Sequence, residues 1–338
     1  MKRNLLYIGN KLSKKGSTVT SIETLGNFLQ TEGFKVTTAS SKKNKVFRLL
    51  DMVWNTLKCP KKNTVVLIDT YSTQNFYYAV LVAWLCRFRT ISYIPILRGG
   101  NLPTRLQNSP DKSKALFKGA YINVAPSHYL MEAFKKRGFT NLIHIPNTLQ
   151  LENYPFLLRK NIQPKLLWVR SFSEIYNPLL ALDVLTLLRS KGYDATLTMV
   201  GPSKDTTFEQ CTTRAKKENL PVTFTGMLTK EAWISLSEAH DIFINTTNFD
   251  NTPVSVMEAM ALGLPVVSTN VGGLPYLIEE TINGLLVPPE NAEIFSEAVE
   301  QLLINPKDAT AMARAAREKV AQFDWHVVKQ QWISLLSQ

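Results

Sequence analysis

Two carboxylates, Asp250 and Glu258, lie eight positions apart and are the side chains of this sequence whose spacing best suggests chemistry. Glu258 falls near the apolar face of a predicted helix, where an unpaired carboxylate is unfavourable unless a donor bonds it. A vicinal diol is a suitable partner, because its two hydroxyls can each donate to one carboxylate oxygen. Asp250 could accept from a further hydroxyl. The alternative interpretation makes Asp250 a turn residue and Glu258 a partly exposed helix residue.

The elements around this pair alternate between strand and helix. Residues 241–245 are a short β-rich run, and a helix is predicted over about 254–262, with Thr252 as its N-cap and Pro253 at its first position. The next strand begins at Val266. This order is half of a parallel α/β layer, in which ligands sit outside the carboxyl ends of the strands. Free N–H groups at the helix start would attract an anion or a sugar oxygen to this position.

The run at 246–275, TTNFDNTPVSVMEAMALGLPVVSTNVGGLP, strongly resembles the retaining glycosyltransferases of family 4, which have the GT-B fold. Members carry a Glu-x7-Glu motif, which is Asp250-x7-Glu258 here, with Asp shortening the reach of the first acid by one methylene. The resemblance implies that Glu258 holds the ribose of a nucleotide sugar. It also implies that Asp250 and the backbone of Asn251, Thr252 and Pro253 address the hydroxyls of the transferred sugar.

Further donor contacts are implied by the same resemblance. Arg170 stands where the family has an Arg that contacts the donor diphosphate, but Tyr176 replaces the Lys usual six residues later. Gly201 and Gly226 resemble the strand-ending glycines that let the backbone approach the nucleotide. Gly16, in the basic segment 14–17, corresponds to the glycine-rich loop after the first strand.

The acceptor side is assigned to the segment Arg98, Gly99, Gly100 and Asn101. Many relatives carry a His near the reacting sugar at about the position of Arg98. An Arg cannot act as a base because it stays protonated, so it would bind an acceptor phosphate or the leaving diphosphate. The alternative is a surface Arg in a flexible loop.

The predicted fold class is α/β. Alternating strand and helix patterns in both halves indicate parallel sheets, and 338 residues are too many for one comfortable core. By resemblance, two Rossmann-like parallel-sheet domains of a GT-B fold face a central cleft. We expect an acceptor-side domain over 1–160, a nucleotide-sugar-binding domain over 161–322, and a helix over 323–338 that crosses back to the first domain. The apolar side of that helix carries Trp325, Val328, Trp332 and Leu335.

Charge is distributed unevenly along the chain. Residues 1–165 hold 26 Lys and Arg against 7 Asp and Glu, a net of +19, so the rest carries −7 of the total of +12. Because of this positive charge, we expect the first half of the chain to bind an anionic partner. No helix-turn-helix, zinc-finger or RNA-binding pattern organises the charge, so nucleic acid is not expected. A membrane surface is the better candidate.

Residues 42–62 offer a specific membrane contact. Val46, Leu50, Trp54 and Leu57 recur at helical spacing, together with Leu49 and Val53, and lysines flank them. A basic amphipathic helix with Trp on its apolar face can lie among anionic headgroups. Alternatively, this stripe packs on the sheet of the first domain, as most amphipathic helices do.

The function implied by the resemblance is a retaining, metal-independent transfer of a hexosyl or N-acetylhexosaminyl group. The sugar would pass from a nucleotide sugar to a glycan or lipid-linked acceptor in cell-surface polysaccharide or glycoconjugate synthesis. We expect no cofactor and no metal site, because no Asp-x-Asp pair is present. The apolar runs are too short for a spanning helix, and three scattered cysteines favour a cytoplasmic protein. The basic first half and residues 42–62 would place it peripherally on the inner face of the plasma membrane. The alternatives are a GT-B nucleotide-sugar epimerase and a non-enzymatic basic protein that binds membrane or nucleic acid.

Overall fold

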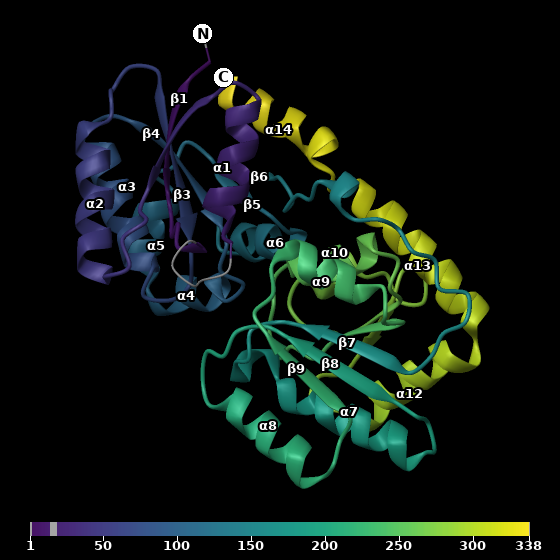
Figure 1. Ribbon diagram of the computed structural model, residues 1–338. Coiled ribbons are helices and arrows are strands. Elements are labelled where there is room, and N and C mark those ends of the chain that lie inside the picture. The colour runs from purple at the N-terminus through teal and green to yellow at the C-terminus, as the bar shows by residue number, and fades with distance from the viewer. Residues whose placement is uncertain (1, 14–18, 338) are drawn as a thin grey trace. The chain divides into compact units, whose positions relative to one another are not determined.

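The computed structural model describes residues 2–13 and 19–337, which fall into two compact units (Figure 1). The first unit comprises Met1–Asn147 together with Val328–Gln338, and the second comprises Thr148–Val327. Each unit contains one six-stranded sheet, and every recorded strand pairing is parallel. The segment 148–160 clusters with the second unit, so the chain divides earlier than position 160.

The first sheet has the strand order β2-β1-β3-β4-β5-β6. Its strands are β1 (Asn4–Ile8), β2 (Lys35–Ala39), β3 (Thr64–Thr70), β4 (Ser92–Leu97), β5 (Asn123–Ala125) and β6 (Leu142–His144). Every residue of β3 is buried, as a central parallel strand covered on both faces requires. The helices are α1 (Ser21–Thr31), α2 (Lys45–Lys58), α3 (Phe76–Phe88), α4 (Leu102–Asn108), α5 (Pro110–Phe117) and α6 (His128–Lys136). Figure 1 shows α2 and α3 side by side on one face and α1 on the other.

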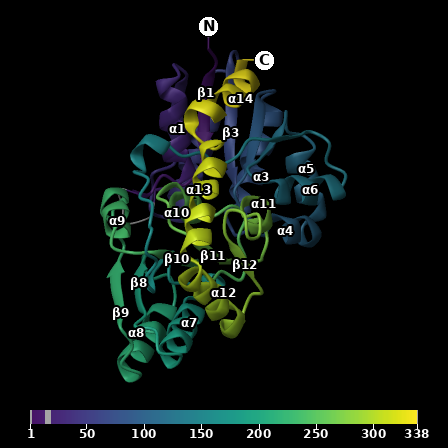
Figure 2. The same cartoon turned by 90° about the vertical axis from the view of Figure 1, so that its right-hand side faces the viewer.

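The second sheet has the order β12-β11-β10-β7-β8-β9. Its strands are β7 (Lys165–Val169), β8 (Thr196–Val200), β9 (Val222–Gly226), β10 (Ile242–Asn245), β11 (Val266–Thr269) and β12 (Leu285–Val287). The helices are α7 (Pro178–Ser190), α8 (Thr207–Lys217), α9 (Lys230–Ser237), α10 (Val254–Ala261), α11 (Leu274–Leu277), α12 (Ala292–Ile304) and α13 (Pro306–Ala321). Two 3-10 turns, η2 (Leu151–Asn153) and η3 (Glu174–Tyr176), complete the unit, which Figure 2 shows from a second direction.

The last helix, α14 (Trp325–Ser337), is shared between the units, because its residues from Val328 onward cluster with the first. Trp325, Val328, Trp332 and Leu335 are all buried, as their common side predicts. Lys329 Nζ also pairs with Glu32 Oε1 of the first unit at 3.3 Å. The return of the C-terminal helix to the first domain is thus confirmed.

The predicted N-cap of α10 is wrong by one residue. Pro253, not Thr252, is the N-cap, and it keeps an extended conformation with φ −68° and ψ 121°. The helical conformation therefore begins at Val254. Pro253 has no polar side chain, and no side chain caps the first turn. None of the described helices is both long and apolar enough to cross a membrane.

Candidate functional site

Four neighbouring strands of the second sheet bring the predicted donor residues to one edge. Strands β10, β7, β8 and β9 are adjacent and parallel, so their carboxyl ends lie together. Arg170 follows β7, Gly201 follows β8, and Gly226 ends β9. The loop 246–253, which contains Asp250, follows β10. Residues that are up to 80 positions apart in the sequence thus converge at one end of one sheet.

Hydrogen bonds attach the start of this loop to the turn η3. Thr246 donates to the carbonyl oxygen of Tyr176 at 2.9 Å, and the Asn248 amide donates to the carbonyl of Ile175 at 2.9 Å. Trp168, inside β7, donates its indole N–H to the Thr246 hydroxyl at 3.0 Å. The loop is therefore held to the strand that presents Arg170 and to the turn that presents Tyr176.

Glycines hold the other side of the loop. Gly272 and Gly273 follow β11, and a Cβ atom on either would overlap a main-chain oxygen, that of Asp250 or Asn251 respectively. Gly273 N–H also donates to the carbonyl of Asp250 at 3.1 Å. Gly201 is similarly close-packed, because a Cβ there would overlap the carbonyl oxygen of Arg170. In this structure these glycines permit backbone to pack on backbone around the acidic loop.

Arg170 and Asp250 form an ion pair at the strand ends, with 16% and 15% of their side chains exposed. The Arg170 guanidinium also lies over the ring of Tyr176, 4.2 Å from its centroid. Burial lowers the pKa of Arg170, and Tyr176 and Glu258 partly oppose that shift. Arg170 Nε is buried without a hydrogen-bond partner among the described residues. Where relatives have a second cation, this chain has Tyr176, whose aromatic face contacts the first cation, Arg170.

Glu258 lies in α10 and is 3% exposed, so the alternative of a partly exposed helix residue is wrong. Its Oε1 accepts a hydrogen bond from the Tyr154 hydroxyl at 2.8 Å and also pairs with Lys230 Nζ. Burial, and then the charge of Glu258, raises the pKa of Tyr154. The partners expected for this carboxylate from its apolar position are therefore supplied within the chain.

Sequence reasoning missed both partners of Glu258. Tyr154 belongs to the segment between the domains, where Tyr154-Pro155 is typical of an interruption between regular elements. Lys230 begins α9, and 45% of its side chain is exposed. The signal that could find them is chemical: a buried carboxylate requires donors, and a Tyr hydroxyl and a Lys ammonium are both donors.

The first turn of α10 provides free donors at the same loop. Because Pro253 offers no side-chain acceptor, the amides at the helix start are without a side-chain cap. Ser255, in that turn, is 8% exposed, and its hydroxyl has no hydrogen-bond partner among the described residues. Uncapped amides and a buried hydroxyl suit an anion or a hydroxyl-rich ligand.

Arg98, in the first unit, is engaged in a buried network. Its Nε bonds Asp69 Oδ1 at 3.1 Å, and its Nη1 bonds Asn147 Oδ1 at 2.6 Å. Tyr7 donates its hydroxyl to the same Asp69 oxygen at 3.0 Å. The Arg98 side chain is 11% exposed, which makes the surface-Arg alternative wrong. Burial raises the pKa of Asp69, and Arg98 opposes the shift.

The other predicted residues of the first unit lie around Arg98 or outside the described residues. A Cβ on Gly99 would come 2.5 Å from the Ser72 amide nitrogen, so this glycine is close-packed against the chain itself. Gly100 follows in the turn, and Asn101 is the N-cap of α4. Gly16 lies outside the described residues.

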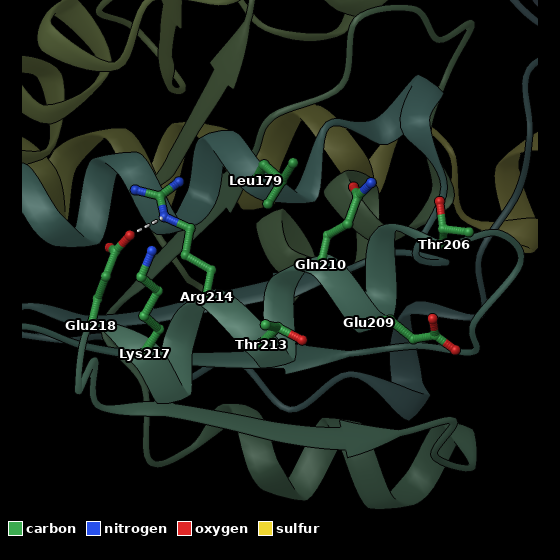
Figure 3. A pocket seen from close by; sticks show the side chains of 8 residues that line it. All are labelled: Leu179, Thr206, Glu209, Gln210, Thr213, Arg214, Lys217 and Glu218. Atoms are coloured by element: carbon green, nitrogen blue, oxygen red, sulfur yellow. Dashed lines mark hydrogen bonds and ion pairs between the residues drawn. The ribbon is translucent and has the colours of Figure 1, made fainter.

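A separate hollow of about 560 Å³ lies along α8 (Figure 3). Its lining includes the ion pair between Arg214 Nε and Glu218 Oε1, at 3.0 Å, and none of the predicted donor residues. Gln210 and Lys217 also line it, and no polar side chain that lines it is left buried without a partner. The candidate site is therefore the edge that carries Arg170, Asp250 and Glu258.

Comparisons with known proteins match this half of the chain. Residues 152–319 fit the family model of glycosyl transferases group 1. The D-inositol 3-phosphate glycosyltransferase of Saccharomonospora viridis is 30% identical over 92 residues, which are 27% of this chain and 21% of that protein. The putative colanic acid biosynthesis glycosyltransferase WcaL of Salmonella typhimurium is 38% identical over 91 residues, 26% of this chain and 22% of that protein. The matched segments thus span less than a quarter of these relatives.

Solved structures match the whole chain. Anabaena HepE, in complex with UDP and glucose, has a TM-score of 0.77 at 16% identity, and 99% of each chain is covered. Sucrose-phosphate synthase from Thermosynechococcus elongatus has a TM-score of 0.79 at 18% identity, again with 99% of each chain covered. At these identities the likeness concerns the fold, and it confirms the expected GT-B architecture of both parallel sheets. By the match over residues 152–319 and by this fold, the chain belongs to the glycosyl transferases group 1 family, glycosyltransferase family 4.

Proposed function

We propose that the protein is a retaining glycosyltransferase that moves a sugar from a nucleotide sugar to a glycan or lipid-linked acceptor. The observation that carries the proposal is the cluster at the carboxyl edge of the second sheet. There Arg170, 16% exposed, pairs with Asp250, and α10 contributes an uncapped start and a nearly fully buried carboxylate, Glu258. A nucleoside diphosphate sugar presents the complementary groups, two phosphates and a ribose diol.

In this proposal the second unit binds the donor. Glu258 accepts from the ribose hydroxyls, and Arg170 with the amides at the start of α10 neutralises the diphosphate. Asp250 and the backbone of residues 251–253 face the sugar. Gly226, which has open space beside its Cα, allows the chain to pass close to the nucleotide, while Gly201 lets Arg170 pack on the end of β8. Arg170 supplies the positive charge for a transfer that uses no metal.

At the anomeric carbon, the transfer forms one bond and breaks one bond. The acceptor oxygen forms a bond to the anomeric carbon as the bond from that carbon to the donor phosphate oxygen breaks. The acceptor proton passes to an oxygen of the leaving phosphate, so no protein base is required and the anomeric configuration is retained. Arg170 would stabilise the charge that develops on the leaving diphosphate.

The first unit, in the same proposal, serves the acceptor through residues 98–101. Arg98 would reach an acceptor phosphate or the leaving diphosphate with the N–H groups that Asp69, Asn147 and Tyr7 do not use. A cytoplasmic position on the inner face of the plasma membrane would give access to a lipid-linked acceptor. HepE in complex with UDP-glucose and relatives in colanic acid biosynthesis support a nucleotide-sugar donor and a polysaccharide product.

Calorimetric binding of UDP-, GDP-, ADP- and CMP-sugars tests the donor site. Glu258→Gln keeps the size of the side chain but removes its charge, and Glu293→Gln on the exposed start of α12 is the matched control. A hydrogen bond to a charged group contributes about 1.5–3 kcal/mol and one to a neutral amide about 0.5–1.5 kcal/mol. Two ribose hydroxyls should therefore lose about 1 kcal/mol each, and Glu258→Gln should weaken binding by roughly 30-fold. A folded wild-type protein that binds no nucleotide sugar would refute the proposal.

The two alternative functions give different results. An epimerase would convert the nucleotide sugar without any acceptor, whereas a transferase releases nucleotide at a rate that depends on acceptor. A non-enzymatic binding protein would show the same binding with Glu258→Gln as without it.

A further inference from the structure

Helix α2 is turned so that most of its apolar stripe faces outward, while Leu49 and Val53 are half-buried. Val46, Leu50, Trp54 and Leu57 are between 43% and 64% exposed, and Phe47 beside them is 64% exposed. The buried residues of the helix are instead Arg48, Met52 and Thr56. Packing of the whole stripe on the sheet, one of the two alternatives for residues 42–62, is therefore wrong.

The buried polar side chains on the inward side of α2 are hydrogen-bonded. Arg48 Nη1 donates to the carbonyls of Lys42 and Lys43 at 3.2 and 3.3 Å, and Thr56 donates to the carbonyl of Met52 at 2.7 Å. Met52 is part of the core cluster of the first unit. Since these buried groups are all bonded, the orientation of the helix is consistent with its packing, and the outward stripe needs a separate explanation.

The neighbouring helix α3 also exposes apolar side chains. Tyr77, Trp84 and Phe88 lie on it at helical spacing and are 48%, 53% and 75% exposed. The rings of Trp84 and Phe88 stack, with centroids 5.9 Å apart and planes inclined by 11°. Arg89 Nη2 donates to the Cys59 carbonyl at 3.0 Å, which joins the C-terminal ends of α2 and α3. The two helices lie side by side in Figure 1.

The charge around this surface is positive. The exposed lysines that flank α2 in the sequence are Lys42, Lys43, Lys45, Lys58, Lys61 and Lys62. Asp51 is the only acid between positions 42 and 62, and no acid occurs between 70 and 110. Lys58 Nζ lies 4.5 Å from the centroid of the Trp54 ring, so one residue pair combines the cationic and the aromatic feature.

We propose that the exposed faces of α2 and α3, together with the exposed lysines at and beyond the ends of α2, bind an anionic lipid bilayer; we call this set of residues the α2–α3 surface. Trp and aliphatic side chains would enter the headgroup region while the lysines pair with lipid phosphates. A second copy of the chain is a poorer occupant, because two such surfaces would bring like charges together. Nucleic acid would use the lysines but would leave the aliphatic stripe in water. The inference names the partner through which the proposed transferase would reach a lipid-linked acceptor.

Flotation of the full chain with lipid vesicles tests this surface. Vesicles of phosphatidylcholine alone are compared with vesicles that also contain phosphatidylglycerol, at low and high salt. Trp54→Ser with Phe88→Ser removes two exposed rings, and Ile282→Ser with Ile304→Ser, both exposed in the second unit, is the matched control. Lys61→Glu with Lys62→Glu reverses two charges, and Lys216→Glu with Lys217→Glu on α8 is its control.

Binding to the anionic vesicles, lost in high salt, is the expected result. Each lysine near an anionic surface contributes ~1 kcal/mol, or about fivefold, so the Lys61 and Lys62 variant should bind at least ~25-fold more weakly. The serine pair should also weaken binding, and both controls should float like the wild type. Equal binding to neutral vesicles, or equal binding of either α2–α3 variant, would overturn the proposal.

Two further outcomes separate this inference from its alternatives. Concentration-dependent dimers that disappear in the Trp54 and Phe88 variant, without vesicle binding, would instead identify a second copy as the occupant. Nucleotide-sugar binding is measured on the same samples. Vesicle binding without nucleotide binding would refute the proposed function and leave the α2–α3 surface standing, and the reverse result would refute only the surface.

Discussion

Tyr154→Phe removes the hydroxyl that donates a hydrogen bond to the buried carboxylate of Glu258, and the effect on stability follows from the structure. The lost hydrogen bond is 2.8 Å long and ends on an oxygen of a residue that is 3% exposed. A hydrogen bond to a charged group contributes about 1.5–3 kcal/mol. Lys230 remains paired with the same oxygen, but at 45% exposure its contribution is screened by solvent. We therefore expect the free energy of unfolding to fall by about 1.5–3 kcal/mol.

Thermal unfolding followed by circular dichroism provides the measurement. The second unit, Thr148–Val327, contains 180 residues. At this size a change of 1 kcal/mol in the free energy of unfolding shifts the Tm by about 2–4 °C. The expected decrease in Tm is therefore about 3–12 °C. Tyr193→Phe, at a half-buried Tyr of the same unit for which no hydrogen bond to a carboxylate is recorded, is the matched control and should change the Tm little.

A double-mutant cycle with Glu258→Gln isolates the interaction itself. Beside a neutral amide the Tyr154 hydroxyl contributes only about 0.5–1.5 kcal/mol, so the two changes should couple by about 1 kcal/mol. Additive effects of Tyr154→Phe and Glu258→Gln, or a Tyr154→Phe variant as stable as the wild type, would refute the assignment of Tyr154 as a donor to the charged carboxylate.

Three further predictions concern other parts of the structure. Gly272→Ala should weaken nucleotide-sugar binding at least tenfold, measured by calorimetry, because its Cβ would overlap the Asp250 carbonyl and displace the acidic loop. Gly192 also has a positive φ but lies in open space, so the control variant Gly192→Ala should bind normally. Arg98→Ala should lower the free energy of unfolding in urea by about 3–5 kcal/mol, because it leaves Asp69 buried without its cation, and adding Asp69→Asn should restore part of the loss. Unchanged stability would contradict the structural role of Arg98. Burial, with a contribution from His128, lowers the pKa of His144 from 6.5 to about 4. The unfolded chain therefore takes up a proton below pH 6.5 that the folded protein accepts only near pH 4. The free energy of unfolding should fall between these two pH values by ~1–2 kcal/mol, after allowance for partial exposure. Urea titrations at several pH values measure this dependence, and His144→Gln should flatten it.

The parts of the site that the sequence predicts are those that depend on local pattern. Strand β10, helix α10 and strand β11 follow from short apolar runs and from a Pro at the helix start, and parallel strands then place their carboxyl ends at one edge. Arg170 and the loop of Asp250 converge for this reason alone. The one-residue error at the N-cap arose because Pro253 is compatible both with the first helical position and with the extended conformation that it adopts.

The parts that the sequence does not predict depend on contacts between distant segments. Tyr154 and Glu258 are 104 positions apart, and no periodicity relates them. The charge of Arg98 predicts an anionic ligand, but it does not reveal that Asp69, from the neighbouring strand, is bonded to it. The stripe of α2 is equally compatible with a core and with an open surface, since only the residues of the underlying sheet decide which side of the helix turns inward.

The sharing of α14 between the units has a consequence for biosynthesis. The first sheet is complete once Asn147 has left the ribosome, yet the final helical segment that covers this unit follows only after the 180 residues of the second unit. At typical rates of translation that interval lasts roughly 10–40 s. Until then the surface that buries Val328, Trp332, Leu335 and Leu336 is uncovered, so the nascent first unit exposes apolar side chains to solvent. Its folding is therefore finished last, although its strands are made first.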